Sequence, residues 1–214
     1  MVSRRRSAEW ISFMVNINLI CRKKSKEFFF FLGIITINAI SIALAVHFYP
    51  EKFKLDYPLS YASMTQSFAL GLPNRRSEII YAVGMFLSGL IMAGFTIYRT
   101  KNNESGLNGV LLPAVCAFGF FVAAFSPNDI KHTTHVLGSA LFVATFWIMA
   151  TSYLFSLRKS WPNWKYWMLQ AILQIPIFAY AIAYFLDLGL VPNYLQKPAF
   201  LVLLLVLLYC APDE

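Results

Sequence analysis

Three residues suited to acid–base or metal chemistry lie three positions apart, in the order Asp129, His132 and His135. A carboxylate and two imidazoles are common zinc ligands, and catalytic zinc takes three protein ligands and a water. On a helix, however, Asp129 and His135 point about 120° apart, so this segment alone makes a strained triad. His47 or a loop residue would have to complete the site. We therefore predict neither a metal site nor a cofactor from this spacing.

A hydroxyl-rich segment upstream supplies two candidate nucleophiles, Ser60 and Ser63. A serine hydrolase would use His135 to activate one of them, but the chain has no nucleophile-elbow motif around either serine. The candidate catalytic residues are Asp129, His132, His135, Ser60 and Ser63. The candidate ligand-binding residues are His47, Tyr57, Ser60, Gln170 and Gln174.

A structural role is the competing interpretation of residues 126–135, and we favour it. Asp129 would cap the helix that follows it, where free N–H groups and the helix dipole favour a carboxylate. A histidine of the segment would then hydrogen-bond Ser60, Tyr61 or Ser63. We predict that the segment in this way clamps the long upstream loop over the bundle.

Other cofactor classes lack their usual residues. Bis-histidine haem needs two histidines at one depth on neighbouring helices. His47 and His135 qualify, but the chain has neither a second pair nor a Cys-x-x-Cys-His motif. A retinal Schiff base needs a lysine inside a membrane span, and no predicted span has one. The spans also contain almost no ionisable residues, which argues against an ion-coupled transporter.

The elements that would position these residues are membrane-spanning helices. Of the 214 residues, 58% are hydrophobic and 13% are charged, whereas soluble domains carry about 25% charged residues. A helix needs about 20 apolar residues to cross a bilayer. The apolar runs that we predict as spans are residues 28–48, 79–98, 109–125, 136–155, 167–186 and 198–210. The sequence thus predicts an all-α fold, a bundle of six transmembrane helices in which the last run is the shortest.

Residues 1–27 form a basic leader ahead of the six-helix domain of residues 28–214. We predict that the leader lies as a helix on the anionic inner leaflet, and the alternative is a disordered basic tail. The basic residues that would contact the leaflet are Arg4, Arg5, Arg6, Arg22, Lys23, Lys24 and Lys26. The net charge of +8 comes from short clusters between apolar runs, a pattern typical of a membrane surface and not of nucleic-acid binding.

Small and polar residues inside the spans predict how the helices pack. Gly84 and Gly138 would let neighbouring helices approach closely, and Asn38 would form a hydrogen bond between helices. Gln170 and Gln174 are four positions apart and share one helical face. That face should point into the bundle, because an amide in lipid lacks hydrogen-bond partners.

The basic residues also predict the orientation. The leader and the loops at residues 99–108 and 158–165 together carry more Lys and Arg than the loops on the other side. The positive-inside rule therefore places both termini in the cytoplasm of a multi-pass protein of the cell membrane. The long loop of residues 49–78 then shares the extracytoplasmic side with His47 and residues 126–134. We expect part of this loop to form a short helix packed on the bundle.

Two stretches carry a family resemblance. They are Tyr57-Pro58-Leu59-Ser60 with Ser63, and Phe125-Ser126-Pro127-Asn128-Asp129 followed by a histidine and by Gly138-Ser139-Ala140-Leu141-Phe142. In these the chain resembles an uncharacterised prokaryotic six-span membrane protein family related to the DRAM-like superfamily. The wider group is linked to membrane-lipid handling, so the resemblance implies a protein that binds a lipid or other amphiphile in an extracytoplasmic pocket. The alternatives are a membrane-embedded lipid-head-group enzyme that uses the His/Asp/Ser cluster, and a small transporter or channel subunit.

Overall fold

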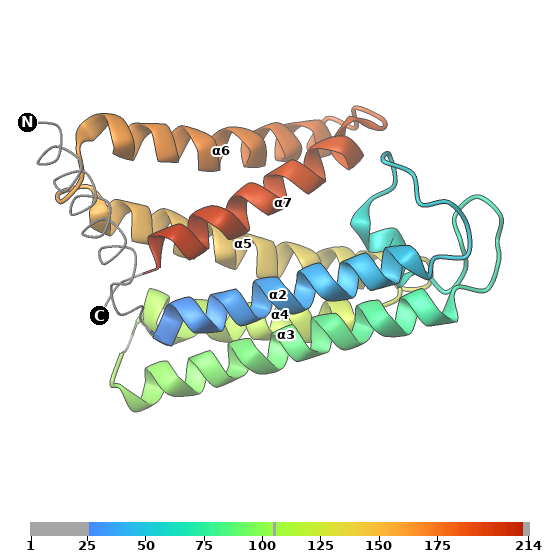
Figure 1. The fold of residues 1–214 in the computed structure, drawn as a ribbon, viewed down its shortest axis with the longest axis horizontal. Coiled ribbons are helices and arrows are strands. Elements are labelled where there is room, and N and C mark those ends of the chain that lie inside the picture. The colour runs from blue at the N-terminus through green and yellow to red at the C-terminus, as the bar shows by residue number, and fades with distance from the viewer. Residues whose placement is uncertain (1–25, 105, 212–214) are drawn as a thin grey trace, which may run out of the picture.

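The fold is that of a computed structural model, which describes residues 26–104 and 106–211 (Figure 1). Its α-helices are α2 (Lys26–His47), α3 (Arg75–Lys101), α4 (Leu112–Ala124), α5 (His132–Leu157), α6 (Asn163–Phe185) and α7 (Val191–Cys210). A 3-10 helix, η1 (Leu59–Ser63), lies in the long loop, and a π-helical turn, η2 (Leu107–Leu111), leads into α4. Most of the basic leader lies outside the described residues, and so does Cys21.

The helices run up and down in chain order, so that α2 begins and α7 ends at the same end of the bundle (Figure 1). The connections after α2, α4 and α6 lie together at the other end, which we call the loop end. Helices α2 to α5 pack as successive neighbours, α7 packs on α5, and α6 packs mainly against α7. The candidate residues at 47–66 and 126–135 therefore share the loop end.

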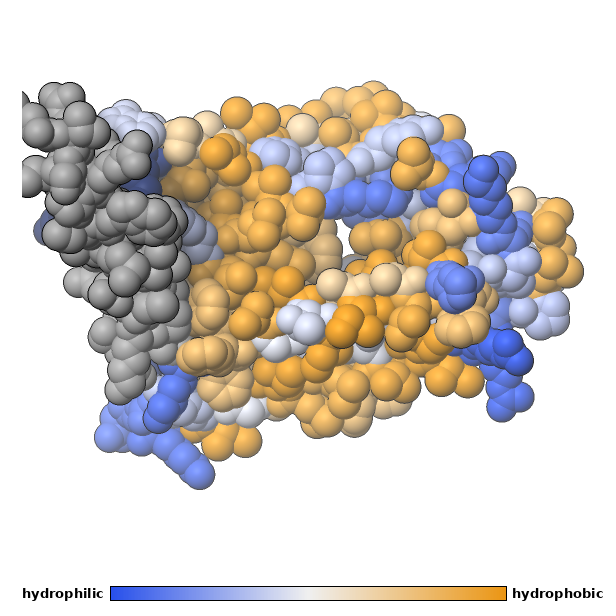
Figure 2. Space-filling view, in the orientation of Figure 1, coloured by the Kyte–Doolittle hydropathy of each residue, from blue (hydrophilic) through white to orange (hydrophobic). Residues whose placement is uncertain are grey.

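Five of these helices, α2, α3, α5, α6 and α7, are long and apolar enough to cross a membrane. Helix α4 is apolar but shorter, with 13 residues after the π-helical turn. Figure 2 shows hydrophobic side chains across the middle of the molecule and hydrophilic ones concentrated toward its ends. The chain is thus a helical membrane protein, as its composition predicts.

Helix α7 begins at Val191, earlier than the expected start at Pro198. Pro192 lies in its first turn, where a proline costs no hydrogen bond, and Pro198 lies inside the helix. The helix therefore includes Gln196 and Lys197, two polar residues that the apolar-run criterion excludes. Both find partners in the long loop, so their polar groups are satisfied within the protein.

Glycines set the closest helix contacts, as predicted for Gly84 and Gly138. A Cβ at Gly84 would lie 2.3 Å from the Cβ of Ser41 in α2. A Cβ at Gly138 would lie 2.7 Å from the backbone nitrogen of Ala123 and 2.9 Å from the carbonyl oxygen of Gly119. Helices α4 and α5 therefore touch through their backbones, an approach that a larger side chain would prevent.

Asn38 forms the predicted interhelical hydrogen bond. Its Nδ2 donates to Ser88 Oγ in α3 at 2.8 Å and to the carbonyl oxygen of Ile34 at 2.9 Å. Asn38 is 2% exposed, and Ser88 is fully buried. The pair links α2 to α3 in the bundle interior through the amide nitrogen, whereas the side-chain oxygen of Asn38 has no hydrogen-bond partner within the described residues.

Candidate functional site

Residues 48–74, which we call the cap, lie over the loop end (Figure 1). The cap folds around a cluster of aromatic rings. The rings are Tyr49, Phe53, Tyr57, Tyr61 and Phe68, with neighbouring centroids 4.7 to 6.5 Å apart. The Tyr49 hydroxyl accepts a hydrogen bond from the Phe68 backbone N–H at 2.9 Å, and burial raises the pKa of Tyr49 to about 12. Tyr57, a predicted ligand-binding residue, is 4% exposed and belongs to this packing core.

The expected short helix in the loop is η1. Its residue Ala62 is fully buried, and its carbonyl oxygen accepts a hydrogen bond from Ser77 Oγ of α3 at 2.9 Å. The two candidate nucleophiles also lie here. Ser63 Oγ donates to the carbonyl oxygen of Ser60 at 2.7 Å, so the Ser63 hydroxyl hydrogen is held inside the turn.

Lys197 fastens the cap to the start of α7. Its Nζ donates to the carbonyl oxygens of Leu55 at 2.6 Å and Tyr57 at 2.7 Å. The neighbouring Gln196 accepts a hydrogen bond from the Leu59 backbone N–H through Oε1 at 3.1 Å. These contacts join residues about 140 positions apart, and nothing in the local sequence indicates them.

Asp129 provides the second tether. Its Oδ2 accepts hydrogen bonds from the Thr65 hydroxyl at 2.6 Å, the Thr65 N–H at 2.9 Å and the Gln66 N–H at 3.2 Å. The prediction that Asp129 caps the following helix is wrong, because α5 begins at His132 after the N-cap Lys131, without a side-chain cap. The carboxylate is instead directed at the N–H groups of the cap. Partial burial would raise the pKa of Asp129, but these hydrogen bonds hold it below its usual value.

The three histidines have separate environments. His47 is exposed at the end of α2. His132 Nδ1 lies 2.9 Å from Asn128 Oδ1, and the buried His135 directs Nδ1 at the carbonyl oxygen of Ser126 at 2.7 Å. The expected histidine hydrogen bonds to Ser60, Tyr61 or Ser63 are not formed, because Asp129 takes the tethering role. Within the described residues, no three His, Cys, Asp or Glu side chains form a group that could hold a metal.

Gln170 and Gln174 lie on one half-buried face of α6, away from the cap, and Gln174 hydrogen-bonds α5. Gln174 accepts a hydrogen bond from Trp147 Nε1 through Oε1 at 2.7 Å, and its Nε2 donates to Thr151 Oγ1 at 3.2 Å. Gln174 Nε2 also donates to Gln170 Oε1 at 3.0 Å, and Gln170 Nε2 donates to the Tyr166 hydroxyl at 3.2 Å. The chain of amides joins α5 to α6 at half-buried positions and does not meet Ser60 or Tyr57.

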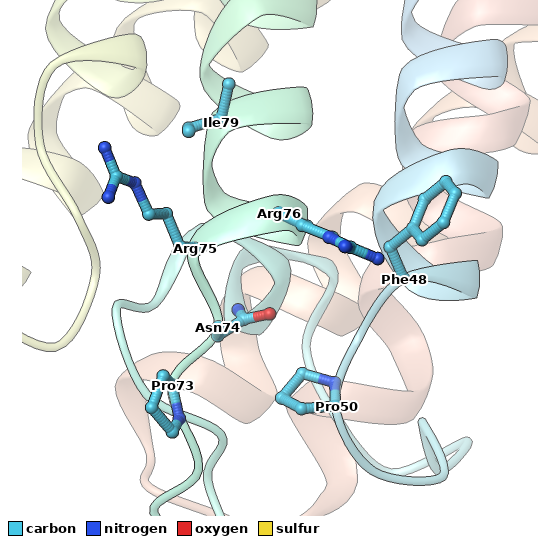
Figure 3. Close-up of a pocket in the computed structure, with 7 residues that line it drawn as sticks. All are labelled: Phe48, Pro50, Pro73, Asn74, Arg75, Arg76 and Ile79. Carbon is cyan, nitrogen blue, oxygen red and sulfur yellow. The ribbon is translucent and has the colours of Figure 1, made fainter.

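A hollow of about 520 Å³ opens where the cap meets the loop-end termini of α2 and α3 (Figure 3). It is lined by Phe48, Pro50, Pro73, Asn74, Arg75, Arg76 and Ile79. Figure 3 shows Arg76 extending toward Phe48 above Pro50 and Asn74, with Arg75 directed to the other side of α3. Both arginines are exposed, and within the described chain neither forms an ion pair with a carboxylate.

The sequence contains only a partial signal for this hollow. The run Pro73-Asn74-Arg75-Arg76 marks a break before an apolar segment. The opposite wall, Phe48 and Pro50, comes from the end of a different helix. Because the two walls meet only in the folded bundle, none of the seven lining residues was among the candidates.

A second feature without a sequence signal is a buried ionic network at the opposite end of the bundle. Arg99 of α3 forms ion pairs with Glu27 of α2 and with Glu104. The Tyr153 hydroxyl accepts from Arg99 at 3.0 Å and donates to Glu27 at 2.9 Å. The network ties α2, α3 and α5 together far from the hollow.

Replacing Asp129 with asparagine is expected to loosen the cap without unfolding the bundle. The change removes the charge from the group that accepts from three donors, the Thr65 hydroxyl and the N–H groups of Thr65 and Gln66. The expected loss is about 1 kcal/mol because water reaches this partly exposed site. Hydrogen exchange at residues 64–68 should speed up about fivefold in Asp129→Asn and stay unchanged in the matched variant Asp187→Asn, which is exposed in the α6–α7 connection.

The same tether gives a pH dependence of known sign. The pKa of Asp129 is lower in the folded protein than in an unfolded chain. Its stabilisation is therefore complete above the ordinary aspartate pKa of about 4 and is lost as the pH falls through the folded-state pKa. The protection of residues 64–68 from exchange, measured relative to the intrinsic rate at each pH, should fall in that acidic range in the native protein but not in Asp129→Asn. Equal acid sensitivity in both proteins would contradict the tether.

Comparisons with known proteins were made at three levels. A scan against protein-family models, a search of curated proteins and a search of solved structures each returned no match. The resemblance to the family related to the DRAM-like superfamily therefore stays a prediction.

Proposed function

We propose that the chain is a six-span protein of the cell membrane that binds a lipid or another amphiphile at the loop end. One observation carries the proposal: in the hollow, the apolar side chains of Phe48 and Ile79 adjoin two exposed arginines that form no ion pair with a carboxylate of the described residues. An amphiphile offers the two parts that such a surface accepts, an apolar chain and a polar headgroup.

The position of the hollow supports a lipid as the ligand. It lies at the ends of α2 and α3, both long and apolar enough to cross a membrane. Side chains at the ends of spans lie near the lipid headgroups. There an arginine can bind a phosphate through two parallel hydrogen bonds. Phe48 is 42% exposed and Ile79 is 50% exposed, which leaves apolar surface for an acyl chain.

The cap supports the proposal because it holds one wall of the hollow in place. Pro50 and Pro73 belong to the cap, which is fastened by Asp129 on one side and Lys197 on the other. A wall that is already ordered loses little conformational entropy on binding, which favours affinity. With the termini in the cytoplasm, as the basic leader favours, the hollow would meet the outer leaflet.

The test is a titration of the purified protein with phosphatidylglycerol in detergent, followed by native mass spectrometry. The double variant Arg75→Gln/Arg76→Gln should bind at least about tenfold more weakly, because it loses charge-assisted contacts of about 1.5–3 kcal/mol each. Lys131→Gln removes an exposed cation at the same end but outside the hollow, and it should bind as the native protein does. Unchanged affinity in the double variant would refute the proposal.

A further inference from the structure

The floor of the hollow contains a buried oxygen that lacks a hydrogen-bond donor. Asn74 is 1% exposed, and within the described chain its side-chain oxygen Oδ1 has no hydrogen-bond partner. Buried polar atoms are nearly always paired in folded proteins. An unpaired acceptor that lines a hollow therefore points to a group supplied from outside the chain.

The orientation of this amide is fixed by its other end. Asn74 Nδ2 donates to the carbonyl oxygen of Met64 at 2.8 Å, and the carbonyl oxygen of Ala62 lies 3.4 Å from it. A flipped amide would place its oxygen against these two acceptors, so the nitrogen must face them. Oδ1 consequently faces away from Ala62 and Met64, and Figure 3 shows it directed between Arg76 and Pro50.

The free oxygen is also unusual for its place in the helix. Asn74 is the N-cap of α3, a position where an asparagine oxygen ordinarily accepts a first-turn N–H. Here the side chain makes no cap hydrogen bond. The Asn74 side chain therefore does not cap α3. Its nitrogen is held by the Met64 carbonyl oxygen, and its oxygen points toward the hollow.

We infer that the headgroup bound in the hollow is a phosphodiester that also carries a hydrogen-bond donor, a hydroxyl or an ammonium group, which Asn74 recognises. This inference rests on the proposed amphiphile binding. Arg76 supplies a cation for the phosphate, Arg75 lines the hollow from the other side of α3, and the Asn74 oxygen beneath Arg76 accepts from the neighbouring donor. A headgroup that has a phosphate alone satisfies Arg76 and leaves Oδ1 unpaired.

The decisive experiment compares two pairs of lipids, each of equal net charge, in which one member has this donor and the other lacks it, with the native protein in the same detergent. Phosphatidylglycerol and phosphatidylmethanol are both anionic diesters, but only the former has headgroup hydroxyls. Pairing a buried acceptor should make phosphatidylglycerol bind about five- to tenfold more tightly. Phosphatidylethanolamine should likewise bind more tightly than phosphatidylcholine, whose quaternary ammonium cannot donate. Equal affinities within either pair would overturn the inference.

The same titrations separate this inference from the proposed function. If phosphatidylglycerol and phosphatidylmethanol bind equally and both lose affinity in Arg75→Gln/Arg76→Gln, the amphiphile site stands and the role of Asn74 is refuted. If neither lipid responds to the arginine variant, the proposed function itself fails. A folded Asn74→Leu variant should show no preference for phosphatidylglycerol. Should that variant not fold, the two lipid pairs in the native protein still decide the question.

Discussion

Replacing Arg99 with glutamine is expected to lower the free energy of unfolding by about 3–5 kcal/mol, the usual cost of removing one partner from a buried ion pair. Arg99 is 6% exposed, and the side chain of its partner Glu27 is 12% exposed. Without the guanidinium, the Glu27 carboxylate would keep a hydrogen bond from the Tyr153 hydroxyl as its remaining contact in the network. One hydrogen bond does not offset the desolvation of a carboxylate.

The geometry around Arg99 explains why the position is sensitive. The guanidinium joins Glu27, at the start of α2, to Glu104, in the connection after α3. Its carbon also lies 5.0 Å from the centre of the Phe95 ring, which favours a cation. Glutamine is shorter than arginine, and it has neither the positive charge nor the several coplanar N–H donors of the guanidinium. The ends of α2 and α3 should therefore separate first.

The free energy can be measured by unfolding in mixed micelles of increasing SDS, with circular dichroism as the signal. Arg158→Gln is the matched control, because Arg158 is an exposed arginine at the same end and should cost little. The double variant Glu27→Gln/Arg99→Gln should be more stable than Arg99→Gln alone, since no buried carboxylate then lacks its cation at that position. Equal stability of Arg99→Gln and Arg158→Gln would show that the network contributes nothing.

Helix–helix contacts that follow from the chemistry of a single residue in an apolar helix could be predicted from the sequence. An asparagine in an apolar helix must find a partner, and Asn38 does so in the neighbouring span. A glycine in such a helix allows close approach, and Gly138 meets the α4 backbone. The two glutamines of α6 share a face for the same reason, and Gln174 binds α5 while Gln170 binds Gln174. In each case lipid leaves a single outcome, because it cannot satisfy polar groups.

Features in which several partners compete could not be predicted. The Asp129 carboxylate could cap its own helix or bind N–H groups of the cap, and only the folded distances decide for Thr65. Lys197 directly precedes the apolar run predicted as the last span, yet it lies inside α7 and binds carbonyl oxygens of a loop far away in sequence. The wall of the hollow at Phe48 and the floor at Asn74 come from separate segments in the same way.

Replacing Gly119 with alanine is expected to lower the free energy of unfolding by about 1–3 kcal/mol, although it adds only one methyl group. The new Cβ would lie 2.7 Å from the backbone nitrogen of Phe142 and 2.8 Å from the carbonyl oxygen of Gly138. Backbone atoms cannot turn aside as a flexible side chain can, so α4 and α5 would have to move apart. That movement would also disturb the adjacent stacked rings of Phe120 and Phe142, whose centroids are 4.4 Å apart.

Gly94→Ala in α3 separates this steric effect from the change in helix propensity. There the nearest atom to a new Cβ is Phe30 Cε1 at 3.9 Å, an ordinary contact. Alanine favours a helix over glycine by about 1 kcal/mol, so Gly94→Ala should be neutral or stabilising in the same SDS titration. If Gly119→Ala were also neutral, the two helices could separate at no cost. Helix α4 is the shortest of the six described α-helices and therefore has the fewest residues to pack against its neighbours. We expect its backbone contact with α5 to be the place where moving two helices apart destabilises the bundle most.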